Sequence, residues 1–128
     1  MKRLLTLSSM LLLLLLLAAA PVRADENTPA PFDNDLKRLA EILGALHYLR
    51  AVCGANEGQK WRNEMQALVD AEAPAGERRH KIIASFNRGY RGFQQTYRTC
   101  TPAADLAIRR YLDEGAKISR EITARYAN

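Results

Sequence analysis

The sequence predicts an all-α protein, a small up-down bundle of three long helices and one short helix with one disulfide. Beyond residue 32, apolar residues recur at helical spacing almost without interruption, and no alternating strand pattern appears. Glycines, prolines and capping residues divide this pattern into four segments. Two cysteines, Cys53 and Cys100, stand at the ends of segments, where a bridge can join them.

Residues 1–24 have the composition of a signal peptide. Lys2 and Arg3 precede a run of leucines from Leu11 to Leu17, and small residues follow up to Ala24. A charged start, an apolar stretch and a small-residue cleavage site are the three parts of an export signal. We therefore expect a periplasmic protein with no stable membrane insertion after cleavage; the alternative is a leader retained as an anchor.

The remaining chain fits one domain with a nearly balanced charge. Residues 25–32 are polar and interrupted by prolines, which predicts a flexible lead-in, and residues 33–128 form the predicted bundle. Removing Lys2, Arg3 and Arg23 lowers the 19 basic residues to 16 against 14 acidic ones, so the net charge falls from +5 to +2. Most of the basic character thus belongs to the leader.

The first helix is expected to begin at Asp33, a good N-cap, with Phe32 packing on its first turn. It ends at Cys53-Gly54, and its apolar stripe contains Leu36, Leu39, Ile42, Leu43, Leu46, Leu49 and Val52. A shorter helix follows Asn56, and its narrow apolar face comprises Trp61, Met65, Leu68 and Val69. The segment Ala73-Pro74-Ala75-Gly76 closes it.

The third helix is predicted from about Glu77 to Thr99, with one apolar face made by Ile82, Phe86, Tyr90, Phe93 and Tyr97. Thr101-Pro102 then supplies an N-cap and a proline at the first helical position. The buried side of the last helix is expected to contain Ala104, Ile108, Tyr111, Leu112, Ile118, Ile122 and Tyr126. Its other face carries opposite charges four residues apart: Arg109/Asp113, Arg110/Glu114, Asp113/Lys117, Lys117/Glu121 and Glu121/Arg125.

The two cysteines predict a structural disulfide. An even cysteine count in an oxidising compartment is typical of a bridge, and this one would close a loop of about 47 residues. Redox or metal roles are disfavoured because the chain has no Cys-x-x-Cys motif and no histidine spaced to complete a zinc site. We expect neither a metal nor a cofactor.

The sequence offers no catalytic constellation. The mature chain has two serines, Ser85 and Ser119, both within predicted helices, and its only histidines are His47 and His80. No nucleophile elbow, zinc-protease motif or phosphate-binding loop occurs. We therefore expect a protein that is not an enzyme; an enzyme using His47 or His80 is the minority alternative.

The most unusual segment is the end of the third helix. Arg88, Arg91, Gln95 and Arg98 form a basic stripe there, and Ser85, Gly89, Gly92 and Thr96 form a stripe of small residues. Each helical glycine costs roughly 1 kcal/mol relative to alanine, so the pair predicts a compensating contact. Close approach of a neighbouring helix is favoured; a shallow groove for a ligand or partner and a helix break are the alternatives. The stripe itself is either a solvated face or a surface for an anionic envelope component.

The mature sequence resembles a small family of secreted alphaproteobacterial proteins that is described only as a domain of unknown function. The resemblance covers nearly all of residues 33–128, and it implies no catalytic residue, cofactor or substrate. The residues that carry it are Leu39 to Gly44, Leu46 to Arg50, Cys53, Trp61-Arg62, Met65, Phe86 to Phe93, Tyr97 and Cys100.

These observations together predict a non-enzymatic periplasmic binding or accessory factor in cell-envelope maintenance. The expected partner is an envelope protein or an anionic envelope component, and export argues against nucleic acid. The candidate binding surface comprises Arg88, Gly89, Arg91, Gly92, Gln95 and Arg98. The alternatives are a holdase-like stress chaperone and the binding of a small ligand or anionic lipid at that surface.

Overall fold

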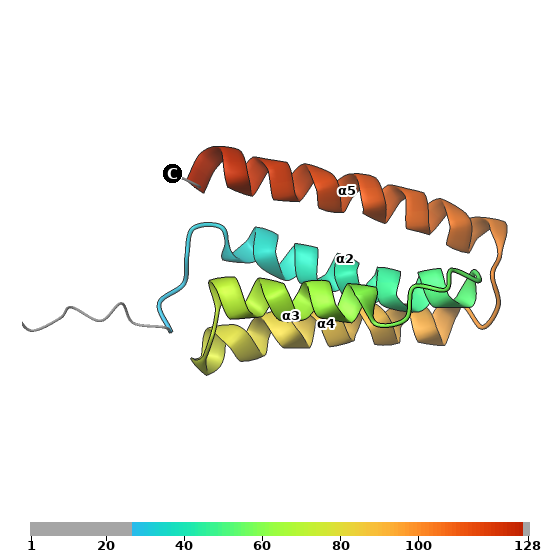
Figure 1. Ribbon diagram of the computed structural model, residues 1–128, viewed down its shortest axis with the longest axis horizontal. Coiled ribbons are helices and arrows are strands. Elements are labelled where there is room, and N and C mark those ends of the chain that lie inside the picture. The colour runs from blue at the N-terminus through green and yellow to red at the C-terminus, as the bar shows by residue number, and fades with distance from the viewer. Residues whose placement is uncertain (1–26, 127–128) are drawn as a thin grey trace, which may run out of the picture.

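The computed structural model describes residues 27–126, so the predicted signal peptide lies outside the described residues. Within this range the chain forms four α-helices and no strand, which confirms the predicted all-α class. The helices alternate in direction along the chain, as an up-down bundle requires (Figure 1). Their bounds are α2 Asp33–Val52, α3 Lys60–Glu72, α4 Gly76–Thr96 and α5 Pro102–Tyr126.

Helix α2 is the centre of the bundle. It packs against each of the other three helices, and Figure 1 shows it between α5 on one side and α3 and α4 on the other. A helix that is covered on several sides needs apolar or small residues around most of its circumference. The buried residues of α2 meet that need: Leu36, Ala40, Ile42, Leu43, Gly44, Ala45, Leu46 and Leu49.

The backbones of α2 and α4 meet at a pair of glycines. A methyl group on Gly44 would overlap the carbonyl oxygen of Phe86, and one on Gly89 would overlap the carbonyl oxygen of Glu41. The same methyl on Gly89 would lie 3.1 Å from the backbone nitrogen of Ala45. Each helix thus presents a glycine to the other helix's backbone, and this confirms the predicted close approach at Gly89.

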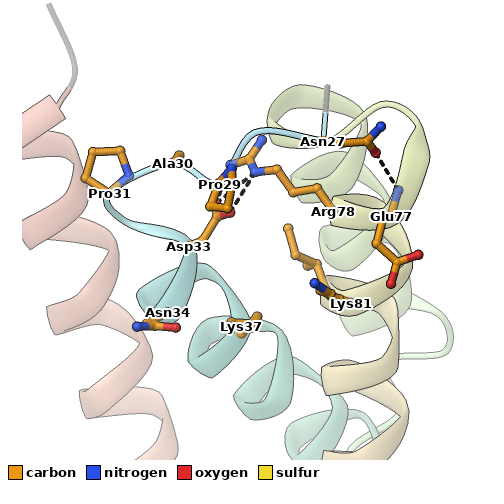
Figure 2. A pocket seen from close by; sticks show the side chains of 11 residues that line it. Asn27, Pro29, Ala30, Pro31, Asp33, Asn34, Lys37, Glu77, Arg78 and Lys81 are labelled. Carbon is orange, nitrogen blue, oxygen red and sulfur yellow. Dashed lines mark hydrogen bonds and ion pairs between the residues drawn. The ribbon is translucent and has the colours of Figure 1, made fainter. Parts of the chain in front are cut away.

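Two helix starts differ from the prediction because charged side chains there have other partners. The N-cap of α2 is Phe32, and the carboxylate of Asp33 accepts hydrogen bonds from Arg78 of α4 at 2.8 and 3.0 Å (Figure 2). Helix α3 begins at Lys60, four residues beyond Asn56. The intervening turn holds Glu57, whose carboxylate accepts hydrogen bonds from the side chains of Arg50 and Trp61.

Helix α4 ends earlier than predicted. Its last residue is Thr96, and Tyr97 already has extended backbone, with ψ near 112°. The phenol of Tyr48 donates a hydrogen bond to the Tyr97 carbonyl at this point. Arg98 therefore lies in the turn after α4, which corrects the prediction that it belongs to the helical stripe.

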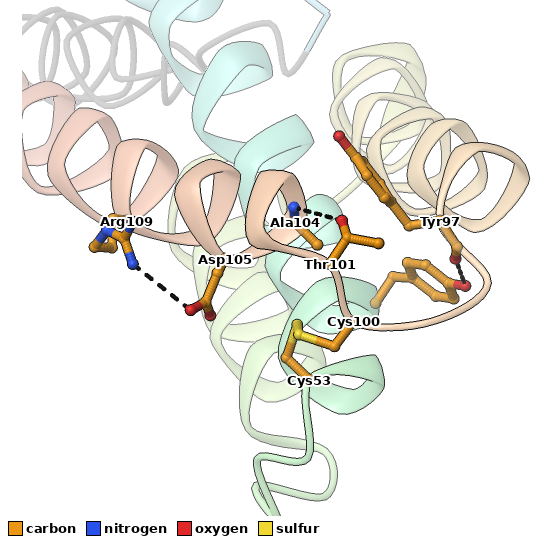
Figure 3. Close-up of a disulfide and its surroundings, with 8 residues drawn as sticks. Cys53, Tyr97, Cys100, Thr101, Ala104, Asp105 and Arg109 are labelled. Carbon is orange, nitrogen blue, oxygen red and sulfur yellow. Dashed lines mark hydrogen bonds and ion pairs between the residues drawn. A yellow bond between two sulfur atoms is a disulfide. The ribbon is translucent and has the colours of Figure 1, made fainter.

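The predicted disulfide joins Cys53 to Cys100 and links the two turns at one end of the bundle (Figure 3). Cys53 follows α2, and Cys100 lies just before α5. The hydroxyl of Thr101 accepts a hydrogen bond from the backbone N–H of Ala104 at 3.1 Å, which confirms the predicted N-cap. The start of α5 is thus fixed to the end of α2.

Helix α5 packs along α2 and buries a narrower stripe than predicted. Leu112 is 37% exposed and Tyr126 is 39% exposed, so neither is a core residue. The buried residues of α5 are Ala104, Ile108 and Gly115. Among the described residues, Lys117–Glu121 is the one predicted intrahelical ion pair present in α5. Glu114 instead accepts two hydrogen bonds from Arg38 of α2, at 2.6 and 2.9 Å.

Candidate functional site

The predicted surface divides into two parts in the structure. Arg88, Arg91, Gly92 and Gln95 are exposed on α4, and Arg98 is exposed in the following turn. Gly89 is buried against α2, so it is a packing residue and does not belong to the surface. We refer to the exposed set Arg88, Arg91, Gly92, Gln95 and Arg98 as the α4 outer face.

A shallow hollow of about 450 Å³ lies on the α4 outer face. Sequence reasoning missed two of its lining residues, Ala84 and Asn87. They precede Arg88 and Arg91 by four residues on the same helix. Residues four apart lie on the same face of a helix, so this spacing could have predicted that Ala84 and Asn87 belong to the surface. The complete lining is Ala84, Asn87, Arg88, Arg91, Gly92 and Gln95.

Gly92 has no packing explanation. A methyl group added there would meet no atom within 4 Å, and α4 is continuous through the position, so the alternative of a helix break is wrong. A helical glycine costs roughly 1 kcal/mol relative to alanine. At Gly89 the close contact with α2 offsets that cost. At Gly92 no contact offsets it, and the missing side chain makes the hollow deeper.

Negative charge is sparse near the α4 outer face. The sequence has no aspartate or glutamate between Arg78 and Ala104. Arg88 lies 3.9 Å from the Glu41 carboxylate and donates a hydrogen bond to the Ser85 hydroxyl at 3.2 Å. Neither Arg91 nor Arg98 forms an ion pair within residues 27–126.

Other arginines of the bundle are held by carboxylates, and the pKa values reflect this. Hydrogen bonds from Arg50 lower the pKa of Glu57 to about 2, and Arg38 likewise lowers the pKa of Glu114. A guanidinium group offers planar donors that match a carboxylate or phosphate. The unpaired arginines of the α4 outer face therefore have their donors available for an external anion.

The structure does not gather the candidate catalytic side chains. His47 is half-buried beside the rings of Tyr90 and Phe86, and burial, with a smaller effect of Arg62, lowers its pKa. His80 is exposed, 4.0 Å from the Glu77 carboxylate. The hydroxyls of both serines donate to helical carbonyls four residues earlier: Ser85 to Lys81 and Ser119 to Gly115. No hydrogen bond joins a serine to an imidazole in the part of the chain that the structure describes.

One group of side chains has the spacing of metal ligands. The potential ligand atoms of Cys53, Cys100 and Asp105 lie within 4.8 Å of one another (Figure 3). A metal binds the thiolate form of cysteine, and both sulfurs here are in the disulfide. The oxidised chain therefore offers only the Asp105 carboxylate at this position.

The fold and surface define a small disulfide-linked helical bundle with a cationic helix face. Within residues 27–126, no helix combines the length and apolarity needed to span a bilayer. A family model matches residues 31–126, and the chain belongs to this family, which is described as a protein of unknown function (DUF2385). Neither the curated proteins nor the solved structures contain a significant match to the chain.

Proposed function

We propose that this chain is a non-enzymatic accessory protein of the bacterial cell envelope that binds an anionic envelope component through the α4 outer face. The observation that carries the proposal is the cationic character of that face, since Arg91 and Arg98 have no acidic partner among the described residues. The signal-peptide pattern of residues 1–24 and the disulfide support placement in the periplasm.

The hollow at Gly92 supports binding of a compact anionic group. Arg88 and Arg91 border the hollow, and Gln95 adds an amide that can donate a hydrogen bond. With no side chain at Gly92, a phosphate group can approach the helix surface between these donors. Anionic phospholipid headgroups present such phosphates at high local density, so we take an anionic lipid surface as the target.

Vesicle co-sedimentation tests the proposal. The wild-type mature protein is mixed with vesicles of phosphatidylcholine alone or of phosphatidylcholine with phosphatidylglycerol. The test variant replaces Arg88, Arg91 and Arg98 with glutamine. A matched control replaces three exposed arginines of α5 with glutamine, and these are Arg109, Arg110 and Arg120.

We expect the wild type and the α5 control to bind the anionic vesicles and the α4 variant to lose most of its binding. Each basic residue near an anionic surface contributes about 1 kcal/mol, so three correspond to a decrease on the order of 100-fold. Binding should also weaken as salt rises. Equal binding by the two triple variants contradicts the proposal, as does equal binding to both vesicle types.

A second candidate function is that of a holdase, favoured by the way α5 is attached. The backbone of helix α5 lies close to α2 alone among the described helices, and its exposed side chains include Leu106, Leu112 and Tyr126. Beside it, a groove of about 220 Å³ reaches the α2 side chains Ile42 and Leu46. Release of α5 would uncover this apolar side of α2. A holdase suppresses aggregation of unrelated unfolded proteins at low pH, and an inactive protein in that assay excludes this function.

A further inference from the structure

A cavity lies at the end of the bundle opposite the disulfide, between α2, α4 and the segment of residues 27–32, which we call the N-terminal strap (Figure 2). Its volume is about 190 Å³, well above the roughly 30 Å³ that one water molecule occupies. Hydrogen bonds to both α2 and α4 hold the strap over it. The Asn27 side chain accepts from the Glu77 backbone at 3.0 Å, and the Ala30 carbonyl accepts from the Asp33 backbone at 3.0 Å.

Arg78 and Asp33 in the cavity wall form an ion pair, so their charges neutralise each other. Arg78 donates hydrogen bonds to both carboxylate oxygens of Asp33 and also to the Glu72 carbonyl. The side chains of Arg78 and Asp33 are only 13% and 16% exposed. Burial alone would raise the pKa of Asp33, but the hydrogen bonds and nearby positive charges lower it, so this carboxylate stays ionised and engaged with Arg78.

Two further cations in the wall form no hydrogen bond to this carboxylate, although the charge of Lys37 helps to lower the pKa of Asp33. Lys37 of α2 and Lys81 of α4 line the cavity, and neither forms an ion pair or hydrogen bond with a residue that the structure describes. The remaining carboxylate, Glu77, is 65% exposed and lies 4.0 Å from His80. The cavity therefore has two ammonium groups, from two different helices, and one solvated carboxylate at its margin.

The rest of the wall is largely apolar. Pro29 and Pro31 of the strap face the cavity from one side, and the buried Ile82 of α4 contributes to the other. A purely inorganic anion would satisfy the lysines but leave these surfaces in contact with water. An organic anion satisfies both, because burial of its apolar part adds a favourable hydrophobic contribution.

We propose that this cavity binds a small organic carboxylate, whose carboxylate lies between Lys37 and Lys81 and whose short apolar part packs against Pro29, Pro31 and Ile82. The site is separate from the α4 outer face and does not depend on the function proposed for it. Specificity arises from combining two cations with apolar residues of the strap and α4 in one cavity, which the α4 outer face does not offer.

An NMR titration tests this site, with butyrate as the probe. Backbone amide resonances of Ala30, Asn34 and Lys81 are followed in the folded mature protein. Butyramide, which has the same shape without the charge, and inorganic phosphate, which has charge without an apolar part, serve as comparison probes. The test variant is Lys37→Gln with Lys81→Gln, and the matched control is Lys60→Gln with Lys117→Gln.

We expect saturable butyrate shifts at these amides in the wild type and in the control, and at least tenfold weaker binding by the test variant. Butyramide and phosphate should also bind at least tenfold more weakly than butyrate. Unchanged melting temperatures show that both variants are folded. Absence of saturation with butyrate, equal binding by the two double variants, or equal binding of phosphate or butyramide overturns the proposal.

Discussion

Two glycines of α4 show how differently one residue type contributes to this protein. Gly89 is buried with no space for a side chain beside the α2 backbone, whereas Gly92 faces open space on the α4 outer face. The sequence presents them three positions apart in the same helical pattern, with nothing local to distinguish them. Only the position of α2 separates a packing residue from one that shapes a surface.

Alanine substitutions should therefore have opposite effects at the two positions. Gly89→Ala places a methyl group against backbone atoms that cannot rotate away, so α2 and α4 must separate. We expect a loss of about 1–3 kcal/mol in the free energy of unfolding, the usual range for overpacking. Gly92→Ala should raise stability by up to about 1 kcal/mol through helix propensity.

Urea denaturation of the two variants measures this difference. Gly44→Ala provides a second test, because Gly44 contacts the α4 backbone in the same way and should match Gly89→Ala in sign. Equal stability of the Gly44 and Gly92 variants would show that the two helices do not cross at the glycine pair. If Gly92→Ala also weakens vesicle binding, then glycine at this position lowers the stability of the helix but is needed for binding at the hollow.

His47 should give the protein a pH-dependent stability in the mildly acidic range. Burial lowers its pKa in the folded state below the ordinary value of 6.5, with Arg62 adding to the effect. Between the two pKa values the unfolded chain binds more protons than the folded one, so the free energy of unfolding rises with pH. Stability is therefore expected to fall as pH decreases below about 6.5.

Variants at the two histidines test this assignment. His47→Phe keeps an aromatic ring beside Phe86 and Tyr90 but cannot take up a proton, so it should flatten the stability curve between about pH 5 and 7. His80→Gln is the matched control at an exposed histidine and should leave the curve unchanged. A curve that stays steep in His47→Phe assigns the titration to another group.

At the scale of elements, α5 is held differently from the other helices. Helices α2 and α4 interlock through glycines, and α3 contacts both of them. Helix α5 packs on α2, with the Arg38–Glu114 pair and the contact of Tyr111 with Phe93 at one side. It therefore depends on a single neighbouring helix for its backbone packing, whereas α3 has two.

Removal of the Arg38–Glu114 pair should loosen α5 selectively. In Glu114→Gln the hydrogen-bonded ion pair to α2 is lost, while the helix keeps its length and apolar contacts. Hydrogen exchange of the α5 amides should accelerate more than that of α2 or α4. Asp113→Asn, a neutralisation at the adjacent exposed position, is the control and should leave exchange unchanged. Uniform acceleration across all helices would contradict a separate attachment of α5.

Features of a helix that depend on residues near in sequence could be predicted, and those that depend on residues distant in sequence could not. Helical periodicity is local, so the sequence predicts the four helices, the glycine stop after Cys53 and the Thr101 cap. Asp33 was predicted as an N-cap, but Arg78, 45 residues away, engages its carboxylate. Glu114 was predicted to pair within α5, yet Arg38 lies 76 residues away in sequence and binds it. Such partners cannot be read from spacing within one helix.

The candidate surfaces show the same division. The α4 outer face follows from the helical pattern, so most of its residues were predictable, although the end of the helix before Arg98 was not. The cavity under the N-terminal strap combines residues from the strap, α2 and α4. Lys37 and Lys81 have no sequence relation that brings them together, and only the parallel packing of the two helices does so.

For the molecule as a whole, the two ends of the bundle are closed by different means. At one end the Cys53–Cys100 bond links the turns after α2 and α4, and at the other the N-terminal strap covers the first turns of the same two helices. The disulfide is within reach of solvent, since Cys100 is exposed. A reductant should therefore act on the disulfide without prior unfolding.

Reduction is expected to destabilise the whole domain and not only its disulfide end. The bond spans a sequence separation of 47 residues that contains α3 and α4, and it fixes the start of α5. In the chain-entropy model a loop of this length contributes roughly 4 kcal/mol, a large share of the 5–15 kcal/mol typical of a domain.

Urea denaturation with and without dithiothreitol measures the loss in the free energy of unfolding. The Cys53→Ser, Cys100→Ser variant should match the reduced protein and not respond to the reductant. If reduction left the urea midpoint unchanged, non-covalent packing of α5 on α2 would suffice to hold the bundle together. A large loss concentrated in α5 amide exchange would instead show that the disulfide and the Arg38–Glu114 pair together keep this helix in place.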